Sequence, residues 1–86
     1  MTKKPIGLTA HARVRLRDRG IDPKWIRETI LEPDWTEVDP GDPAIERRFR
    51  AIPEFGGRIL RVACSETNSN IRVISAMFDR NARRKP

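Results

Sequence analysis

Residues 56–78, GGRILRVACSETNSNIRVISAMF, decide the fold that the sequence predicts. Apolar and polar side chains alternate through segments 58–66 and 70–78, as is typical of half-buried β-strands. Between these segments, the dipeptide Asn68-Ser69 favours a two-residue hairpin turn. The stretch therefore predicts two antiparallel strands at the centre of a sheet.

The segments before this stretch extend the sheet. A third strand is expected over residues 44–52, joined to segment 58–66 by a two-residue turn at Gly56-Gly57, and a short fourth strand over residues 35–38. A slip of one residue exchanges the faces of a strand, so the register predicts which side chains are buried together. The turns predict that Ala51 pairs with Val62, Phe49 with Cys64, Cys64 with Val73 and Leu60 with Met77.

In this register one face of the sheet is apolar and the other is basic. The apolar face, a predicted core, collects Phe49, Ala51, Leu60, Val62, Cys64, Val73 and Met77. The opposite face collects Arg48, Arg50, Arg61 and Arg72, with Ala63, Ile74 and Ala76 between them. Since arginines without carboxylate partners repel one another, the basic face is either a platform for nucleic acid or an ordinary solvated surface.

A helical hairpin is predicted in front of these strands. Thr9 is a suitable N-cap and Gly20 a suitable C-terminal stop for a helix over residues 10–19. Asp22 followed by Pro23 then begins a second helix, since aspartate caps a helix and proline fits its first turn.

The second helix is expected to end near Leu31, because Pro33 follows. One of its faces carries apolar side chains that would cover the apolar side of the sheet, namely those of Trp25, Ile26 and Ile30, with Thr29 beside them. The predicted fold class is therefore α+β, with an N-terminal helical hairpin packed on one face of a sheet of three to four antiparallel strands.

Composition limits the classes of function. The chain of 86 residues has a net charge of +6 at pH 7, and most of its 18 basic residues are arginine. Arginine grips phosphate or carboxylate with a planar, bidentate fork, so nucleic acid or an acidic protein is the first class of ligand to consider. The length fits one domain, residues 1–86, with an ordered part over about residues 8–80 and frayed ends at Met1–Gly7 and Asn81–Pro86.

Other classes receive no support from the sequence. Cys64 is the only cysteine, so we expect neither a disulfide framework nor a thiolate zinc site, and no metal or cofactor. No apolar run has membrane-spanning length, and the first ten residues, MTKKPIGLTA, have no apolar signal-peptide core. We therefore expect a soluble, cytoplasmic protein that has no contact with a membrane.

Residues 8–22, LTAHARVRLRDRGID, place the one histidine of the chain among arginines. His11, Arg15 and Arg19 are spaced i, i+4 and i+8 and should line one side of the first helix. Histidine titrates near neutrality and arginine supplies fixed charge, which are the two requirements of RNA cleavage through attack of the 2′-hydroxyl. His11 is therefore a candidate general acid or base, or else a first-turn residue that holds the start of the helix.

The same segment resembles the opening of a bacterial family, domain of unknown function 4258. In that family a Thr-x-His segment leads into a helix that ends in Arg-Gly-Ile. GGRILRVACSE and IRVISAMFDR also resemble its paired strands, and the second is similar to the RIISAR strand of BrnT toxins. Both families are grouped with the RelE and ParE type of toxin fold. The resemblance covers roughly residues 8–80.

The resemblance implies a toxin of a toxin–antitoxin system that acts on RNA or ribosome-bound messenger RNA, as a metal-independent endoribonuclease, and has a small antitoxin as partner. It implies that Arg61 and Arg72 on the sheet stabilise charge. Helices on the apolar face would keep the candidate catalytic His11 away from these arginines unless the start of the first helix reaches around the rim of the sheet. The expected RNA contacts are Arg15, Arg19, Arg48, Arg50 and Arg58. RelE-type toxins commonly also use a tyrosine, and this chain has none.

Two other interpretations remain open at this point. ParE-type toxins keep the fold but inhibit DNA gyrase, so the chain is alternatively a non-enzymatic module that occupies a protein or nucleic-acid target. The third interpretation is a small domain whose basic surface only keeps it soluble. Cleavage of RNA by the pure protein separates the first interpretation from the second, and a neighbouring antitoxin gene separates both from the third.

Overall fold

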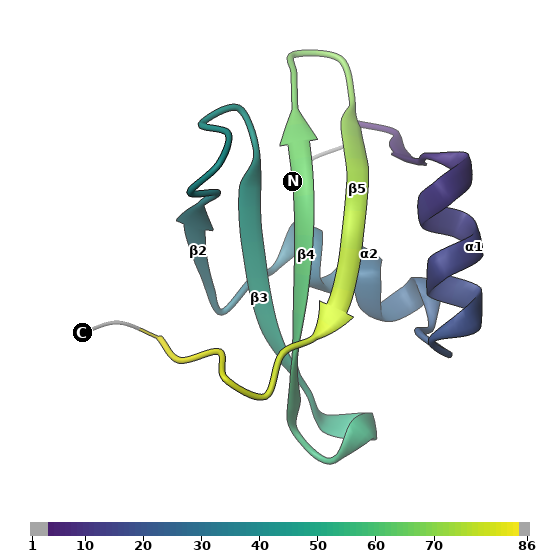
Figure 1. Cartoon of the computed structure of the whole chain (residues 1–86), viewed down its shortest axis with the longest axis vertical. Coiled ribbons are helices and arrows are strands. Elements are labelled where there is room, and N and C mark those ends of the chain that lie inside the picture. The colour runs from purple at the N-terminus through teal and green to yellow at the C-terminus, as the bar shows by residue number, and fades with distance from the viewer. Residues whose placement is uncertain (1–3, 85–86) are drawn as a thin grey trace.

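The computed structural model describes residues 4–84, which form two helices and a five-stranded mixed sheet. The strand order is β1-β5-β4-β3-β2, with β1 parallel to β5 and the other neighbours antiparallel. Figure 1 shows α2 behind the sheet and α1 standing beside β5. The elements are β1 (Ile6–Leu8), α1 (Ala10–Asp18), α2 (Pro23–Leu31), β2 (Trp35–Val38), β3 (Glu46–Ile52), the 3-10 turn η1 (Pro53–Phe55), β4 (Arg58–Glu66) and β5 (Ile71–Phe78).

The α+β class and the two helices are confirmed, and local signals explain them. The predicted N-caps Thr9 and Asp22 each accept a hydrogen bond from a backbone N–H of the helix that follows. After α1, Gly20 adopts a φ of +67°, and the N–H groups of Gly20 and Ile21 donate to carbonyls of the last helical turn. The side chains of Ile21 and Leu16 are both buried, as is typical of this helix-ending motif.

The prediction of a purely antiparallel sheet with three to four strands is wrong, because β1 adds a fifth, parallel strand. Residues 6 and 7 were expected to fray, but Ile6–Leu8 pairs with Ile71–Val73, and the N–H of Ile71 donates to the carbonyl of Pro5. A strand of three residues is too short to produce a periodic pattern in the sequence. At the predicted frayed C-terminal end, residues 81–84 form no helix or strand, and residues 1–3 and 85–86 lie outside the described residues.

The predicted register between β3 and β4 is also wrong. The 3-10 turn η1 and the two glycines after it make a longer connection than a two-residue turn, so that Ile52 pairs with Arg58. Phe49 consequently pairs with Arg61 and not with Cys64, and Ala51 pairs with Ile59 and not with Val62. The shift is an odd number of residues, and it therefore exchanges the two faces of β3.

The register between β4 and β5 is confirmed next to their turn, where Cys64 pairs with Val73. Beyond this pair the ladder contains a bulge: Ala63 pairs with Ser75, which leaves Ile74 without a partner on β4. Leu60 therefore pairs with Phe78 and not with Met77.

The shifted register of β3 divides the arginines of the sheet between its faces, contrary to the prediction. Arg48 and Arg50 lie on the face that α2 covers, where each donates from Nη1 to a backbone carbonyl at the end of α2, at 3.0 and 2.6 Å. Arg61 and Arg72 lie on the opposite face, which neither α1 nor α2 covers and which we call the open face. The prediction of a single basic face is therefore wrong.

The core fills the space between the helices and the sheet. Val62, Cys64 and Val73 are buried there together with Ile26 and Ile30 of α2, as predicted. Trp25 is half-buried and packs against this cluster, as predicted.

Other predicted core residues lie elsewhere. Phe49 is buried, but on the open face, where its ring stacks on Trp35 with centroids 4.7 Å apart. Ala51 changes face with β3, and the bulge of β5 moves Met77 to the open face and Ala76 into the core.

Candidate nucleic-acid interface

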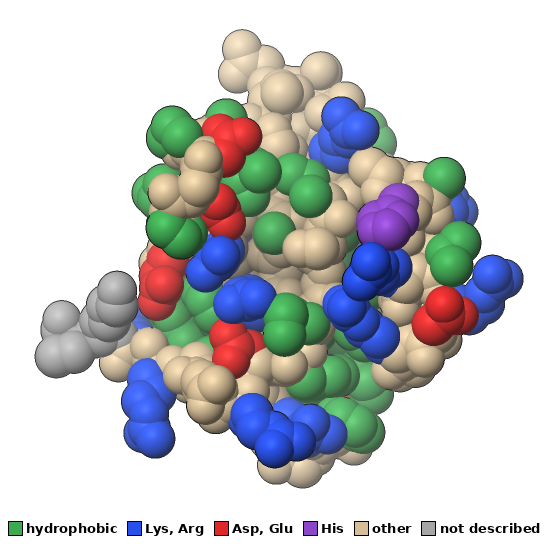
Figure 2. All heavy atoms as spheres, in the orientation of Figure 1, with side chains coloured by type: hydrophobic (Ala, Val, Ile, Leu, Met, Phe, Trp, Pro, Cys, Tyr) green, Lys and Arg blue, Asp and Glu red, His purple; other side chains and the backbone are tan. Residues whose placement is uncertain are grey.

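α1 lies beside the second half of β5, beyond the part that pairs with β1. Nη1 of Arg19 fixes this position by donating to the backbone carbonyl of Ala76 at 2.9 Å. The two elements enclose a groove of about 170 Å³, which we call the histidine groove. Figure 2 shows the imidazole at the margin of the open face, with basic side chains next to it. The groove is lined by His11, Ala12, Arg15, Arg19, Ile74, Ser75, Ala76 and Met77.

Three of the predicted site residues meet in this groove. Nε2 of His11 accepts a hydrogen bond from Nε of Arg15 at 3.1 Å, and Arg19 follows one turn later on the same side of α1. This bond makes Nε2 the ring atom that faces the arginine, and Nε2 is the atom that would accept a proton if His11 acts as a general base. The same bond also fits the alternative role of His11 as a residue that holds the first turn of the helix.

Arg61 lies next to the groove on the open face. Its Nη2 contacts the sulfur of Met77, a groove residue, at 2.9 Å. Its Nη1 is 3.0 Å from Oδ2 of Asp79, and both side chains are mostly buried, with 25% and 17% of their surface exposed. The charge of Arg61 is therefore already partly compensated, which the sequence did not predict.

A second ion pair compensates charge farther along the open face. Nε of Arg47 is 3.0 Å from Oδ1 of Asp39. The backbone N–H of Gly41 and the guanidinium of Arg47 together hold the pKa of Asp39 below its ordinary value. The open face is therefore less basic than a count of its arginines suggests.

Arg72 is the predicted site residue with the freest side chain. It is exposed on the open face of β5 and makes no hydrogen bond or ion pair with any residue from 4 to 84. Its neighbour on β1 is Gly7, which adds no side chain that could shield it. Arg72 can therefore contact an anion that extends beyond the groove.

The remaining predicted RNA contacts lie away from the groove. Arg48 is only 12% exposed and bonds to Glu46 at 2.7 Å and to Glu66 at 2.6 Å. Arg50 holds the end of α2, as described above, and Arg58 lies over the ring of Phe55 at 4.9 Å. None of these three arginines lines the histidine groove, so they are not part of the candidate interface.

The network around Arg48 shifts two pKa values. Hydrogen bonds from Arg48 and then Lys4 hold the pKa of Glu66 below its ordinary value. Burial by itself would lower the pKa of Arg48, but its hydrogen bonds with Glu66 and Glu46 outweigh burial and raise the pKa. Arg48 therefore stays charged and paired.

The wall of the groove that β5 provides was not predicted from the sequence. Ser75 offers a hydroxyl and Met77 a thioether, and both face α1 only because of the bulge at Ile74. No dipeptide or periodicity in this segment indicates a bulge, so no signal in the sequence identified these residues.

Neither a metal site nor a membrane-spanning helix is found among the described residues 4–84. No three or more of their His, Cys, Asp or Glu side chains are grouped so that they could hold a metal ion. None of their helices has the length and apolar character to cross a membrane.

Comparisons with known proteins give a family but no activity. No curated protein and no solved structure matches the chain. Residues 8–78 match the family model described as "Domain of unknown function (DUF4258)".

Proposed function

Because the chain belongs to the family described as domain of unknown function 4258, whose description names no activity, we propose a function from the histidine groove itself. The protein binds single-stranded RNA in this groove and cleaves it without a metal ion. The observation that carries the proposal is the row of His11, Arg15 and Arg19 along one wall of the groove. It combines the only imidazole of the chain with fixed positive charge.

Binding follows from the chemistry of the groove walls. Arg15 bonds to no carboxylate in the described part of the chain, so its guanidinium can take two oxygens of one phosphate. The hydroxyl of Ser75 on the other wall can donate to the same phosphate or to a ribose. A space of about 170 Å³ accommodates a phosphate and its sugar but not a duplex, which favours a single strand. Arg72 extends the path of the strand over the open face.

The proposed reaction is a transesterification within the RNA. The 2′-oxygen attacks the adjacent phosphorus, the bond from phosphorus to the 5′-oxygen breaks, and a 2′,3′-cyclic phosphate and a 5′-hydroxyl result. A phosphate that takes the guanidinium of Arg15 releases Nε2 of His11, which then accepts the 2′-hydroxyl proton. The leaving 5′-oxygen takes its proton from solvent. Arg61 stabilises the charge of the transition state after its ion pair with Asp79 opens, and Arg72 binds a phosphate farther along the strand.

We further propose, from the resemblance to RelE and ParE toxins, that the protein is the toxin of a toxin–antitoxin pair in the cytoplasm. Its substrate is then free or ribosome-bound messenger RNA, and its partner is a small antitoxin. The helical hairpin followed by antiparallel strands β2 to β5 supports this proposal. A gene for a small acidic or DNA-binding protein beside this gene is the observation that tests it.

The ion pair between Arg61 and Asp79 favours a second candidate function, a non-enzymatic module that blocks an RNA or protein target. Such a module needs affinity but no transition-state charge, and it needs no tyrosine, which this chain lacks. It predicts RNA binding in the groove without cleavage.

Matched variants of α1 test the proposal. Arg15→Ala removes a groove arginine, whereas Arg13→Ala removes the same charge from a residue that does not line the groove. Arg15→Ala should weaken binding of a labelled single-stranded RNA about three- to tenfold and reduce the slope of log affinity against log salt by about 0.7, because one phosphate contact is lost. Equal effects of the two variants would mean that only bulk charge binds RNA.

Cleavage is tested with His11→Ala. The single-turnover rate should fall by about two to four orders of magnitude if His11 transfers the proton. The melting temperature of the same preparation separates this result from the structural role of His11, which predicts a lower melting temperature and an unchanged rate per folded molecule. Absence of cleavage by the wild-type protein, on free and on ribosome-bound RNA, would leave the binding module as the function.

A further inference from the structure

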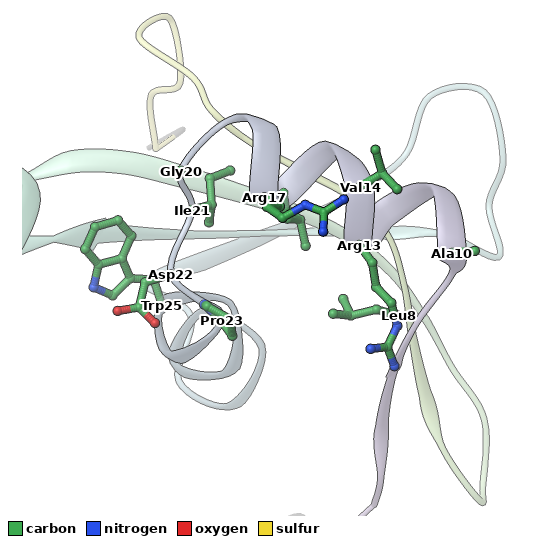
Figure 3. A pocket seen from close by; sticks show the side chains of 11 residues that line it. Leu8, Ala10, Arg13, Val14, Arg17, Gly20, Ile21, Asp22, Pro23 and Trp25 are labelled. Atoms are coloured by element: carbon green, nitrogen blue, oxygen red, sulfur yellow. The ribbon is translucent and has the colours of Figure 1, made fainter.

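A larger groove lies on the other side of α1, between that helix and the start of α2 (Figure 3). Its volume is about 930 Å³, and it shares no lining residue with the histidine groove. We call it the helical groove. Its apolar lining comes from Leu8, Val14, Leu16, Ile21, Pro23 and Trp25.

The apolar lining is open to solvent. Val14 is 47% exposed although it lies on a helix whose other exposed side chains are mostly charged, and Trp25 is only half-buried. Leu16 and Ile21 form the buried floor. Exposed apolar surface inside a concave site is typical of a place where another molecule binds.

Two arginines give this groove its charge. Arg13 and Arg17 are exposed and lie one helical turn apart on the lining of the groove; in Figure 3 Arg13 extends from α1 past Leu8, and Arg17 lies along α1. Neither side chain makes a hydrogen bond or ion pair with the described residues 4–84. The one carboxylate in the lining, that of Asp22, already accepts the N–H of Lys24 as the cap of α2.

We propose that the helical groove binds an acidic amphipathic helix of another protein. Aliphatic side chains of this helix fill the space beside Val14 and Trp25, and carboxylates one turn apart pair with Arg13 and Arg17. Charge complementarity selects this occupant. A second copy of the chain would bring another net charge of +6 to a basic groove, and a nucleic acid would leave the apolar lining uncovered.

This inference goes beyond the proposed action on RNA and does not depend on it, because no groove residue is shared. It supplies a binding surface for a protein partner of stated chemistry, whether the chain is a ribonuclease or a non-enzymatic module. RNA in the histidine groove and an acidic helix in the helical groove can bind at the same time.

A synthetic amphipathic peptide of about 14 residues tests the proposal, with leucines at i, i+3, i+4 and i+7 and glutamates at the polar positions. A matched peptide carries lysines in place of the glutamates. In proton–nitrogen NMR spectra of the full-length protein, the indole N–H of Trp25 reports on the groove. The indole of Trp35, stacked on Phe49 on the open face, is the internal control.

The glutamate peptide should shift the Trp25 indole signal in a saturable way and leave the Trp35 signal in place, and the lysine peptide should shift neither. Arg17→Ala should weaken binding about tenfold, whereas Arg15→Ala, with the same change in charge, should change it less than twofold. Equal binding of both peptides, equal losses in the two variants, or no shift at Trp25 would overturn the proposal. A Trp25 shift on concentration of the protein alone would identify a second copy as the occupant and would also overturn it.

A single-stranded RNA in the same experiment keeps the two proposals apart. RNA should shift the imidazole signals of His11 and leave the Trp25 indole in place. A shift of Trp25 by RNA would assign the helical groove to nucleic acid and overturn the inference. Failure of the imidazole signals to move would contradict the proposed function alone.

Discussion

Replacing Arg48 by alanine removes a connection between β3 and the end of α2. The guanidinium donates to the carbonyl of Ile30 at 3.0 Å, to Glu46 at 2.7 Å and to Glu66 at 2.6 Å, with only 12% of the side chain exposed. The sequence predicted Arg48 as an RNA contact, but the structure places it on the face that α2 covers. The variant should therefore lose stability and not RNA affinity.

The magnitude follows from the three partners. A hydrogen bond between a charged group and a carbonyl contributes about 1.5–3 kcal/mol. The carboxylates of Glu46 and Glu66 are 43% and 31% exposed, so each ion pair adds about 0–1 kcal/mol, and both carboxylates regain water in the variant. The free energy of unfolding should fall by about 1.5–5 kcal/mol in total. In a domain of this size, that loss corresponds to a decrease of roughly 6–40 °C in melting temperature.

Thermal and urea unfolding followed by circular dichroism measure this change. Arg27→Ala is the matched control, because Arg27 is exposed on α2, has no hydrogen bond to a described residue, and carries the same charge. It should cost less than about 0.5 kcal/mol. RNA binding, measured where both variants are folded, should be equal. The reasoning would be refuted by equal melting temperatures of the two variants, or by an affinity loss specific to Arg48→Ala.

Three further predictions follow from single residues. Arg48 and then Lys4 hold the pKa of Glu66 below its ordinary 4.5, so this carboxylate stabilises the fold fully above about pH 4.5 and loses its effect as the pH falls through the lower folded pKa. Glu66→Gln should therefore flatten the acid part of a plot of urea midpoint against pH. A plot that the substitution leaves unchanged would contradict this prediction. Gly20→Ala should lower stability by about 1–2 kcal/mol, because a side chain is strained at a φ of +67°, and an unchanged urea midpoint would count against the helix-ending role of Gly20. Burial raises the pKa of the Cys64 thiol, so the thiol should react with a disulfide reagent only as fast as the protein unfolds. Rapid reaction of the native protein would show that solvent reaches the core at Cys64.

The helices could be predicted because their signals are local. Thr9, Asp22 and Gly20 act on backbone groups within three or four residues, and the structure contains the same caps and the same stop. The row of His11, Arg15 and Arg19 was predictable for the same reason, since helical periodicity alone places these residues on one side of α1.

The register of β3 depended on contacts that the sequence does not reveal. Gly56-Gly57 is a plausible two-residue turn, but the native connection begins at Pro53. The ring of Phe55 packs on Trp25 and Phe78, with centroids 5.6 and 4.7 Å away, and these distant partners hold the longer turn. One wrong turn was enough to exchange a face, and it moved Arg48 and Arg50 from the predicted interface into structural roles.

The position of α1 was equally out of reach. Whether His11 could meet the sheet depended on where α1 lies beside β5, and this position involves buried side chains of α1 and the bond from Arg19 to the carbonyl of Ala76, 57 residues away in the sequence. The bulge at Ile74 then turns Ser75 and Met77 toward the helix. Both features are tertiary and neither leaves a pattern in the chain.

The proton NMR signals of the single imidazole test the central claim, that RNA binds in the histidine groove, most directly. His11 is the only histidine of the chain, so its ring signals need no assignment. The protein is titrated with a short, fluorescently labelled single-stranded RNA, and the change in fluorescence of the label gives the fraction of RNA bound. The ring signals of His11 should shift in proportion to this fraction, because a phosphate of the RNA replaces the imidazole as the partner of Arg15. Arg15→Ala should weaken this response, and Arg13→Ala should leave it unchanged. RNA that saturates the protein while the imidazole signals stay in place would contradict the account.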